Sequence, residues 1–169
     1  MRLSLPVASL FLSTLVASEP LSLFTGGQRV LGDKGEAVPG DNPLTYCNAA
    51  HDADLLILDY VNLDPNPPLA GTVLTIEAVG TLLETVGEGA YVNLQVKYGL
   101  IKLLTTRADL CEQVSNVDLN CPVEKGKISL IKDVELPQQI PPGTYTVLAD
   151  AYTVDDKHIV CFEATVKFS

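Results

Sequence analysis

The chain has 169 residues, 47% of them hydrophobic, and eleven basic residues stand against twenty-one acidic ones, for a formal net charge of −10. This composition excludes a disordered chain, because it supplies enough apolar surface for the core of one domain. It also argues against a nucleic-acid partner, since phosphate binding needs clustered Lys and Arg.

The N-terminal segment has the pattern of a secretory signal peptide. Arg2 precedes an almost uninterrupted apolar run from Leu3 to Ala17, and the run closes on Val16, Ala17 and Ser18. Small residues at these positions suit signal peptidase. A retained membrane anchor is the alternative, but the run is shorter than the ~20 residues that a bilayer needs. We predict a signal peptide over residues 1–18 and entry into the secretory pathway.

The next segment, residues 19–40, has no sustained hydrophobic period and contains five glycines and two prolines. Such a composition is typical of a flexible tail or a propeptide. We therefore predict a single folded domain over residues 41–169. The sequence does not choose between export and a vacuolar or lysosome-like lumen as the final location.

From residue 45 onward, runs of strand length alternate apolar and polar residues, and Pro- or Gly-containing turns separate them. These runs cover residues 54–63, 72–80, 91–104, 127–136, 144–153 and 159–168. Residues 81–86 fit either a helical turn or another strand. About seven strands with no long helix predict an all-β fold, an antiparallel β-sandwich of immunoglobulin-like type.

The run YVNLQVKYGLIKLL, residues 91–104, carries more apolar surface than one face of one strand needs for a protein core. Apolar and polar residues alternate regularly at its start, but after Gly99 four of the next five residues are aliphatic. This surplus either packs a solid core or faces an apolar ligand. The residues concerned are Val92, Leu94, Val96, Leu100, Ile101, Leu103 and Leu104.

Four cysteines in a secreted chain allow three disulfide pairings. Cys111 and Cys121 flank a segment that reads as a loop between strands, so we pair them locally. Cys47 then pairs with Cys161 and ties the start of the domain to its last strand.

A metal site is the alternative use of two of these cysteines. Cys47 with His51, and His158 with Cys161, would supply two Cys and two His, a set that can hold zinc. The spacings match no recurrent zinc motif, however, and neighbouring cysteines of a secreted protein oxidise. We therefore predict no metal.

The sequence contains no Gly-rich phosphate loop, nucleophile elbow, HExxH pattern or dinucleotide fingerprint, so we predict neither an enzyme nor a cofactor. His51 and His158 are the two candidate general bases near neutral pH. The HDAD run that holds His51, Asp52 and Asp54 reads as a solvated entry to the first strand, and His158 reads as part of a charged surface turn.

Four stretches together resemble the ML lipid-recognition domain family, in particular its fungal phospholipid-transfer branch, which is related to the Niemann-Pick type C2 sterol carrier. They are Cys47 with the following LILDYVNLDPNPP, the run CEQVSNVDLNCPVEKGK, the strand IPPGTYTVLADAY and the terminal IVCFEATVKF. The most specific is NCPVEKG, residues 120–126. The resemblance covers residues 45–169.

The resemblance implies two splayed sheets around an apolar cavity that takes lipid chains. The surplus apolar residues of 91–104 would then line or rim this cavity. We add nine residues from the other strands, because alternation places their side chains on the inward face. They are Leu74, Ile76, Leu130, Val147, Ala149, Ala151, Phe162, Ala164 and Val166.

At the cavity mouth the resemblance implies a rim segment at Ile140, Pro141 and Pro142. We add Tyr98, whose hydroxyl can face a headgroup. Lys97, Lys102, Lys125 and Lys127 are the cations available to a lipid phosphate, and we assign Lys97 and Lys102 to the mouth.

The implied function is a non-catalytic carrier that binds a phospholipid, acts as a monomer and touches membranes transiently. A sterol carrier and a secreted recognition protein that binds lipid are the alternatives.

Overall fold

The computed structural model describes residues 35–48 and 50–169, where it has eight strands and one short helix. The elements are β1 (Leu44–Tyr46), β2 (Leu56–Asp64), β3 (Val73–Leu82), β4 (Tyr91–Tyr98), β5 (Ile101–Asp109), α1 (Leu110–Ser115), β6 (Gly126–Glu135), β7 (Gly143–Tyr152) and β8 (His158–Phe168). The predicted signal peptide and most of the predicted tail lie outside the described residues.

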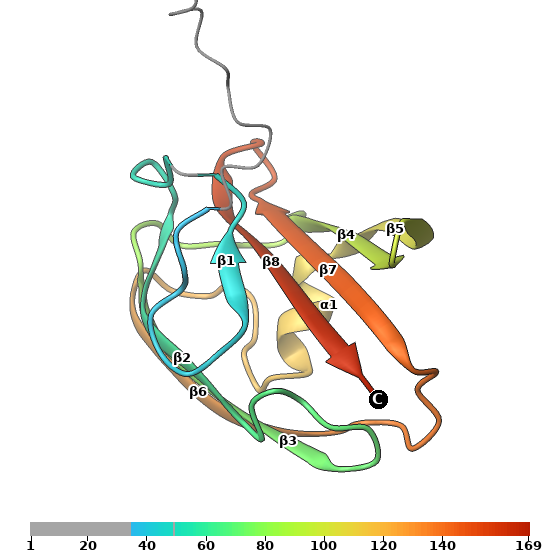
Figure 1. The fold of residues 1–169 in the computed structure, drawn as a ribbon. Helices are drawn as coiled ribbons and strands as arrows, with labels where there is room; N and C mark the ends of the chain where they lie inside the picture. Colours follow the sequence, from blue (N-terminus) through green and yellow to red (C-terminus); the bar gives the residue numbers. More distant parts are fainter. Residues whose placement is uncertain (1–34, 49) are drawn as a thin grey trace, which may run out of the picture. The chain divides into compact units, whose positions relative to one another are not determined.

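The strands form two antiparallel sheets (Figure 1), which confirms the predicted fold class. One sheet has the order β1-β8-β7-β4-β5, and the other has the order β2-β3-β6. In Figure 1 the second sheet forms the layer at the lower left, and β7 and β8 run diagonally through the first. No helix among the described residues has the length and apolar character that a bilayer crossing requires.

The apolar stretch 91–104 proves to be a hairpin of two strands, β4 and β5. The turn between them consists of Gly99 and Leu100, and Gly99 has a φ of +55°, which residues other than glycine seldom adopt. A register shift follows the turn, because Val96 pairs with Leu104 whereas Lys97 pairs with Lys102. The alternation is interrupted in the sequence because the chain reverses direction there.

Two segments differ from their predicted structure. The loop predicted between Cys111 and Cys121 begins with helix α1, whose N-terminus is capped by Asp109 through a 3.1 Å bond from the backbone N–H of Glu112. The tail predicted over 19–40 ends earlier than expected, since residues 35–40 pack against the sandwich. Val38 is buried there, and its N–H donates to the carbonyl of Leu44.

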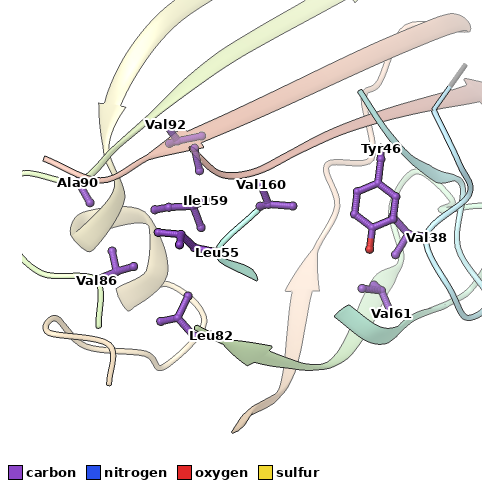
Figure 2. Close-up of a cluster of buried hydrophobic side chains, with 11 residues drawn as sticks. Val38, Tyr46, Leu55, Val61, Leu82, Val86, Ala90, Val92, Ile159 and Val160 are labelled. Atoms are coloured by element: carbon purple, nitrogen blue, oxygen red, sulfur yellow. The ribbon is translucent and has the colours of Figure 1, made fainter. Parts of the chain in front are cut away.

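The core fills the end of the sandwich at which β8 begins. Figure 2 shows Leu55, Leu82, Val86, Ile159 and Val160 gathered near α1, with Tyr46, Val38 and Val61 as a second group. All belong to one cluster of buried residues. The core is therefore concentrated at one end rather than spread along the strands.

Both predicted disulfides are present. Cys47 joins Cys161 over a sequence separation of 114, and Cys111 joins Cys121 over a separation of 10. The backbone N–H of Cys47 also donates to the carbonyl of Cys161. Oxidised cysteines offer no thiolate to a metal, so the zinc alternative at Cys47 and Cys161 does not hold.

Candidate functional site

A cavity of about 260 Å³ lies between the two sheets and is the candidate site. One wall comes from the inner face of β2, β3 and β6, and another from β7 and β8. Helix α1 and the loop after it cover a third side. The principal lining residues are Leu56, Leu58, Ala78, Leu82, Leu110, Val114, Val117, Leu119, Ile128, Leu130, Ala151, Val160 and Phe162.

The lining has one chemical character throughout. Every lining residue is aliphatic, aromatic or glycine, apart from Cys121, which is held in its disulfide. Such a wall offers no hydrogen bond or charge to a polar ligand, and a polar group brought into it would lose its hydration without compensation. The cavity is therefore suited to a hydrocarbon.

The inner faces continue beyond the cavity and become exposed at the opposite end of the sandwich. Register places Leu104, Val147 and Val134 on the inner faces, yet these side chains are 47%, 41% and 37% exposed. Apolar side chains that face inward are exposed only where the opposing sheet no longer covers them. The sandwich is thus closed around its core at one end and open at the other.

Three of the residues predicted for the cavity, Leu130, Ala151 and Phe162, line it. Most of the others lie on the same inner faces, between the cavity and the open end or beside the core. Register and strand alternation place Leu74, Ile76, Val92, Leu94, Val96, Val147, Ala149, Ala164 and Val166 there.

The four aliphatic residues of the hairpin lie farther out. Leu100 in the turn is fully exposed, and Ile101, Leu103 and Leu104 are each about half exposed. They form an apolar projection at the open end rather than a wall of the 260 Å³ cavity. We call the segment from Leu100 to Leu104 the hairpin tip.

The predicted mouth separates into two groups. Tyr98 donates a 2.8 Å hydrogen bond to the carbonyl of Pro142, which brings the end of β4 to the loop of Ile140, Pro141 and Pro142. Gly143 follows this loop, and a Cβ there would come within 2.3 Å of the Tyr98 ring. The loop and ring can therefore approach closely only with glycine at this position.

Lys97 and Lys102 form the other group. They are cross-strand partners, on the face of the hairpin opposite to Val96 and Leu104. They therefore lie on the outer face of the five-stranded sheet, Lys102 within the hairpin tip and Lys97 opposite it on β4. Register likewise places Lys127 on an outer face, and its ammonium contacts Asp59 at 3.2 Å.

The cavity residues that the sequence prediction missed come mainly from β2, β3 and α1 with its following loop. Leu110 and Val114 are spaced i and i+4, which is typical of one helical face, and Val117 continues this spacing just after the helix. That spacing would have indicated the helix and its inward side. β2 was predicted as a strand, but its alternation is broken by a register shift near Leu58.

The closed end holds a polar cluster that the sequence interpretation treated as solvated. Asp54 is buried, and its Oδ1 lies 2.5 Å from Nδ1 of His158, whose Nε2 lies 3.1 Å from Oδ1 of Asp150. Burial raises the pKa of Tyr152, and the hydrogen bond that its hydroxyl donates to Asp150 adds to this. The cluster joins the entry to β2 with β7 and β8.

Replacing His158 with Leu is expected to lower the free energy of unfolding by roughly 2–4 kcal/mol, because the buried carboxylate of Asp54 would lose its hydrogen-bond partner. Chemical denaturation at neutral pH measures this. His51→Leu is the control, since His51 contacts the largely exposed Glu36 at 3.5 Å, and a loss below about 1 kcal/mol is expected. Equal losses for both variants would contradict a structural role specific to His158.

Comparison with known proteins gives a consistent result. The model of the ML domain family matches residues 41–168. A phosphatidylglycerol/phosphatidylinositol transfer protein of Neurospora crassa is 52% identical over 99% of this chain and 94% of its own length. The protein of that name from Emericella nidulans is 53% identical over 96% of this chain and 95% of its own length.

Two solved structures share the fold at low sequence identity. A Niemann-Pick type C2 protein from the Japanese carpenter ant has a TM-score of 0.51 at 12% identity, covering 75% of this chain and 98% of its own. Chicken MD-1 in complex with lipid IVa has a TM-score of 0.52 at 20% identity, covering 73% of this chain and 86% of its own.

Proposed function

Since the chain belongs to the ML domain family, we propose that it is a non-catalytic carrier that binds a phospholipid and transfers it between membranes. The observation that carries the proposal is the wholly apolar cavity, which adjoins an open end of the sandwich. Relatives that are more than half identical over nearly the whole chain bear the name of phosphatidylglycerol/phosphatidylinositol transfer proteins, which supports this lipid class.

The energetics explain why a carrier is useful without any bond being broken. Exposure of each CH₂ group to water costs ~0.8 kcal/mol, so a sixteen-carbon chain costs on the order of 12 kcal/mol. Spontaneous movement of a lipid through water is correspondingly slow. A preformed apolar cavity offsets most of this cost while the headgroup stays near water.

The cavity volume limits how much of the lipid can be enclosed. An apolar protein cavity of about 150 Å³ accepts one benzene molecule. A cavity of 260 Å³ would therefore hold part of an acyl chain but not two whole chains. In our proposal, the remaining chain length lies against the exposed inner faces at the open end, next to Val134 and Val147, or the sheets separate further on loading.

The hairpin tip is the proposed contact with the membrane during transfer. Its exposed side chains, Leu100 and Ile101 foremost, can enter the apolar boundary of a bilayer. Lys97 and Lys102 lie next to them on the outer face and supply local positive charge on a chain of net charge −10, which anionic lipids would otherwise repel. The contact is transient in this proposal, and the carrier works as a monomer.

Changing the tip should slow transfer without reducing lipid capacity. For Leu100→Asp combined with Ile101→Asp, we expect the rate of phospholipid transfer between vesicles to fall at least tenfold, while the amount bound at equilibrium stays near one per protein. Ile57→Asp is the control, because Ile57 is exposed on the outer face of β2. A transfer rate unchanged by the double variant would contradict membrane contact at the tip.

The test of the function itself is native mass spectrometry of the purified protein, followed by identification of any lipid that organic solvent extracts. One phospholipid per chain, together with transfer of labelled phosphatidylglycerol between vesicles, is expected. Bound sterol would favour the sterol carrier instead. A protein that is empty and takes up neither lipid would overturn the carrier function.

The cellular setting that we propose is the secretory pathway, with residues 1–18 as the signal peptide. Two disulfides are typical of proteins from oxidising compartments. In the proposed carrier, the cluster of His158 and Asp54 has the structural role of closing one end of the sandwich, and it takes no part in a reaction.

A further inference from the structure

One charged residue lies where the alternation of a strand calls for an apolar one. On β6, Ile128 and Leu130 line the cavity, and the next residue on the same face is Lys132, followed by Val134. The register agrees, because Lys132 is the cross-strand partner of Ile76, and Leu130 is the partner of Ala78, another lining residue. Lys132 therefore stands between the cavity and the open end.

No other charged side chain has this placement in the strands of the described structure. The remaining Lys and Arg residues of the strands alternate to the outer faces, as Lys97, Lys102, Lys127 and Lys167 illustrate. The carboxylates of Glu77, Asp133 and Glu163 also fall on outer faces. Placing an ammonium group on an apolar inner face costs free energy unless a partner compensates for it.

The compensation comes from the loop after α1. Nζ of Lys132 lies 3.1 Å from Oδ2 of Asp118, and Asp118 stands between two residues that line the cavity, Val117 and Leu119. The Lys132 side chain is 31% exposed and that of Asp118 is 75% exposed. The ion pair thus bridges the rim of the cavity from β6 to the covering loop, and the lysine side chain is partly exposed.

We infer that Lys132 is the binding site for the phosphodiester group of the lipid whose chain occupies the cavity. This inference rests on the proposed function and specifies the part of the site that recognises the headgroup. An ammonium group has three donors, and one bond to Asp118 leaves two for phosphate oxygens. The aliphatic stem of the lysine continues the apolar wall, so chain and phosphate meet the same side chain. Phosphatidylglycerol and phosphatidylinositol supply this anion next to their chains.

The test compares a lipid that carries a phosphodiester headgroup with one that has the same chains and no headgroup. The wild-type protein, Lys132→Gln, Lys132→Arg and the outer-face control Lys127→Gln are each titrated with phosphatidylglycerol and with diacylglycerol of the same chains. Lys132→Gln should weaken phosphatidylglycerol binding roughly 10-fold or more, the effect of losing a charge-assisted hydrogen bond, and leave diacylglycerol binding within about 2-fold. Lys132→Arg should restore most of the loss, and Lys127→Gln should match the wild type.

The outcomes separate this inference from the proposed function. Equal loss of both lipids in Lys132→Gln, with the unfolding midpoint unchanged, would make Lys132 a wall residue and overturn the phosphate site while the carrier stands. A wild-type protein that binds neither lipid would overturn both. The same phosphodiester also occurs in soluble molecules, so glycerophosphoglycerol is added as a competitor of phosphatidylglycerol. Strong competition would assign the site to free phosphoesters instead of to a lipid headgroup.

Discussion

Replacing Ala78 with Phe is expected to lower phospholipid loading strongly while the sandwich stays folded. Ala78 lies on the central strand β3 and contributes a small side chain to the cavity wall. Because a cavity of about 150 Å³ is filled by one benzene ring, a phenyl group inside 260 Å³ removes much of the room for an acyl chain. Loading should fall at least tenfold in a vesicle extraction assay.

Stability should respond in a different way from loading. The new ring would occupy existing apolar space, so the free energy of unfolding should change by less than about 2 kcal/mol. A graded series, Ala78→Val, Ala78→Leu and Ala78→Phe, should reduce loading in that order. Ser129→Phe is the matched control, since Ser129 is exposed on the outer face of β6, opposite Val79. Full loading of Ala78→Phe would show that lipid binds elsewhere.

Removing each disulfide in turn should affect stability and lipid binding to different extents. In the chain-entropy model, the bond from Cys47 to Cys161, which closes a separation of 114 residues, contributes about 5 kcal/mol. The bond from Cys111 to Cys121, over a separation of 10, contributes about 3 kcal/mol. Double replacement of the first pair by Ala should therefore cause the larger loss in denaturant unfolding.

Lipid binding should rank the same two variants in the opposite order, once each is measured under conditions in which it is folded. The short bond fastens α1 and the loop after it, and this segment covers the cavity through Leu110, Val114 and Leu119. Without it the cover is held only by packing, and we expect the rate of lipid release to rise severalfold. If release is equally fast in both variants, α1 does not act as the cover.

The sequence predicts those structural features that depend on residues close together in the chain. Alternation over residues 127–136 and 159–168 predicts β6 and β8 with errors of one or two residues at the ends. The pairing of Cys111 with Cys121 follows from their short separation. By contrast, the hairpin of β4 and β5 reads as one overlong run, because Gly99 alone marks the turn and the usual two-residue turn signals are absent.

The cavity was harder to predict than the sheets, because its wall is defined by where the two sheets diverge. Strand phase assigns Leu94 and Leu130 equally to the interior, yet only Leu130 lines the cavity. Lys132 escaped notice for a related reason. A lysine is read as a solvated residue by default, although its alternation with Ile128 and Leu130 already indicates the inner face, and the register with Ile76 agrees.

The register shift in β5 also bears on how readily this strand could pair with a strand of another chain. β5 is one of the two edge strands of the five-stranded sheet and is exposed along most of its length. An apolar edge strand is a template onto which a second copy can add a strand and begin a fibril. The shift that leaves Leu103 outside the pairing bends this edge, and Lys102 and Arg107 charge it. The strand that, in the proposed carrier, presents apolar side chains to a bilayer is thereby a poor template for aggregation.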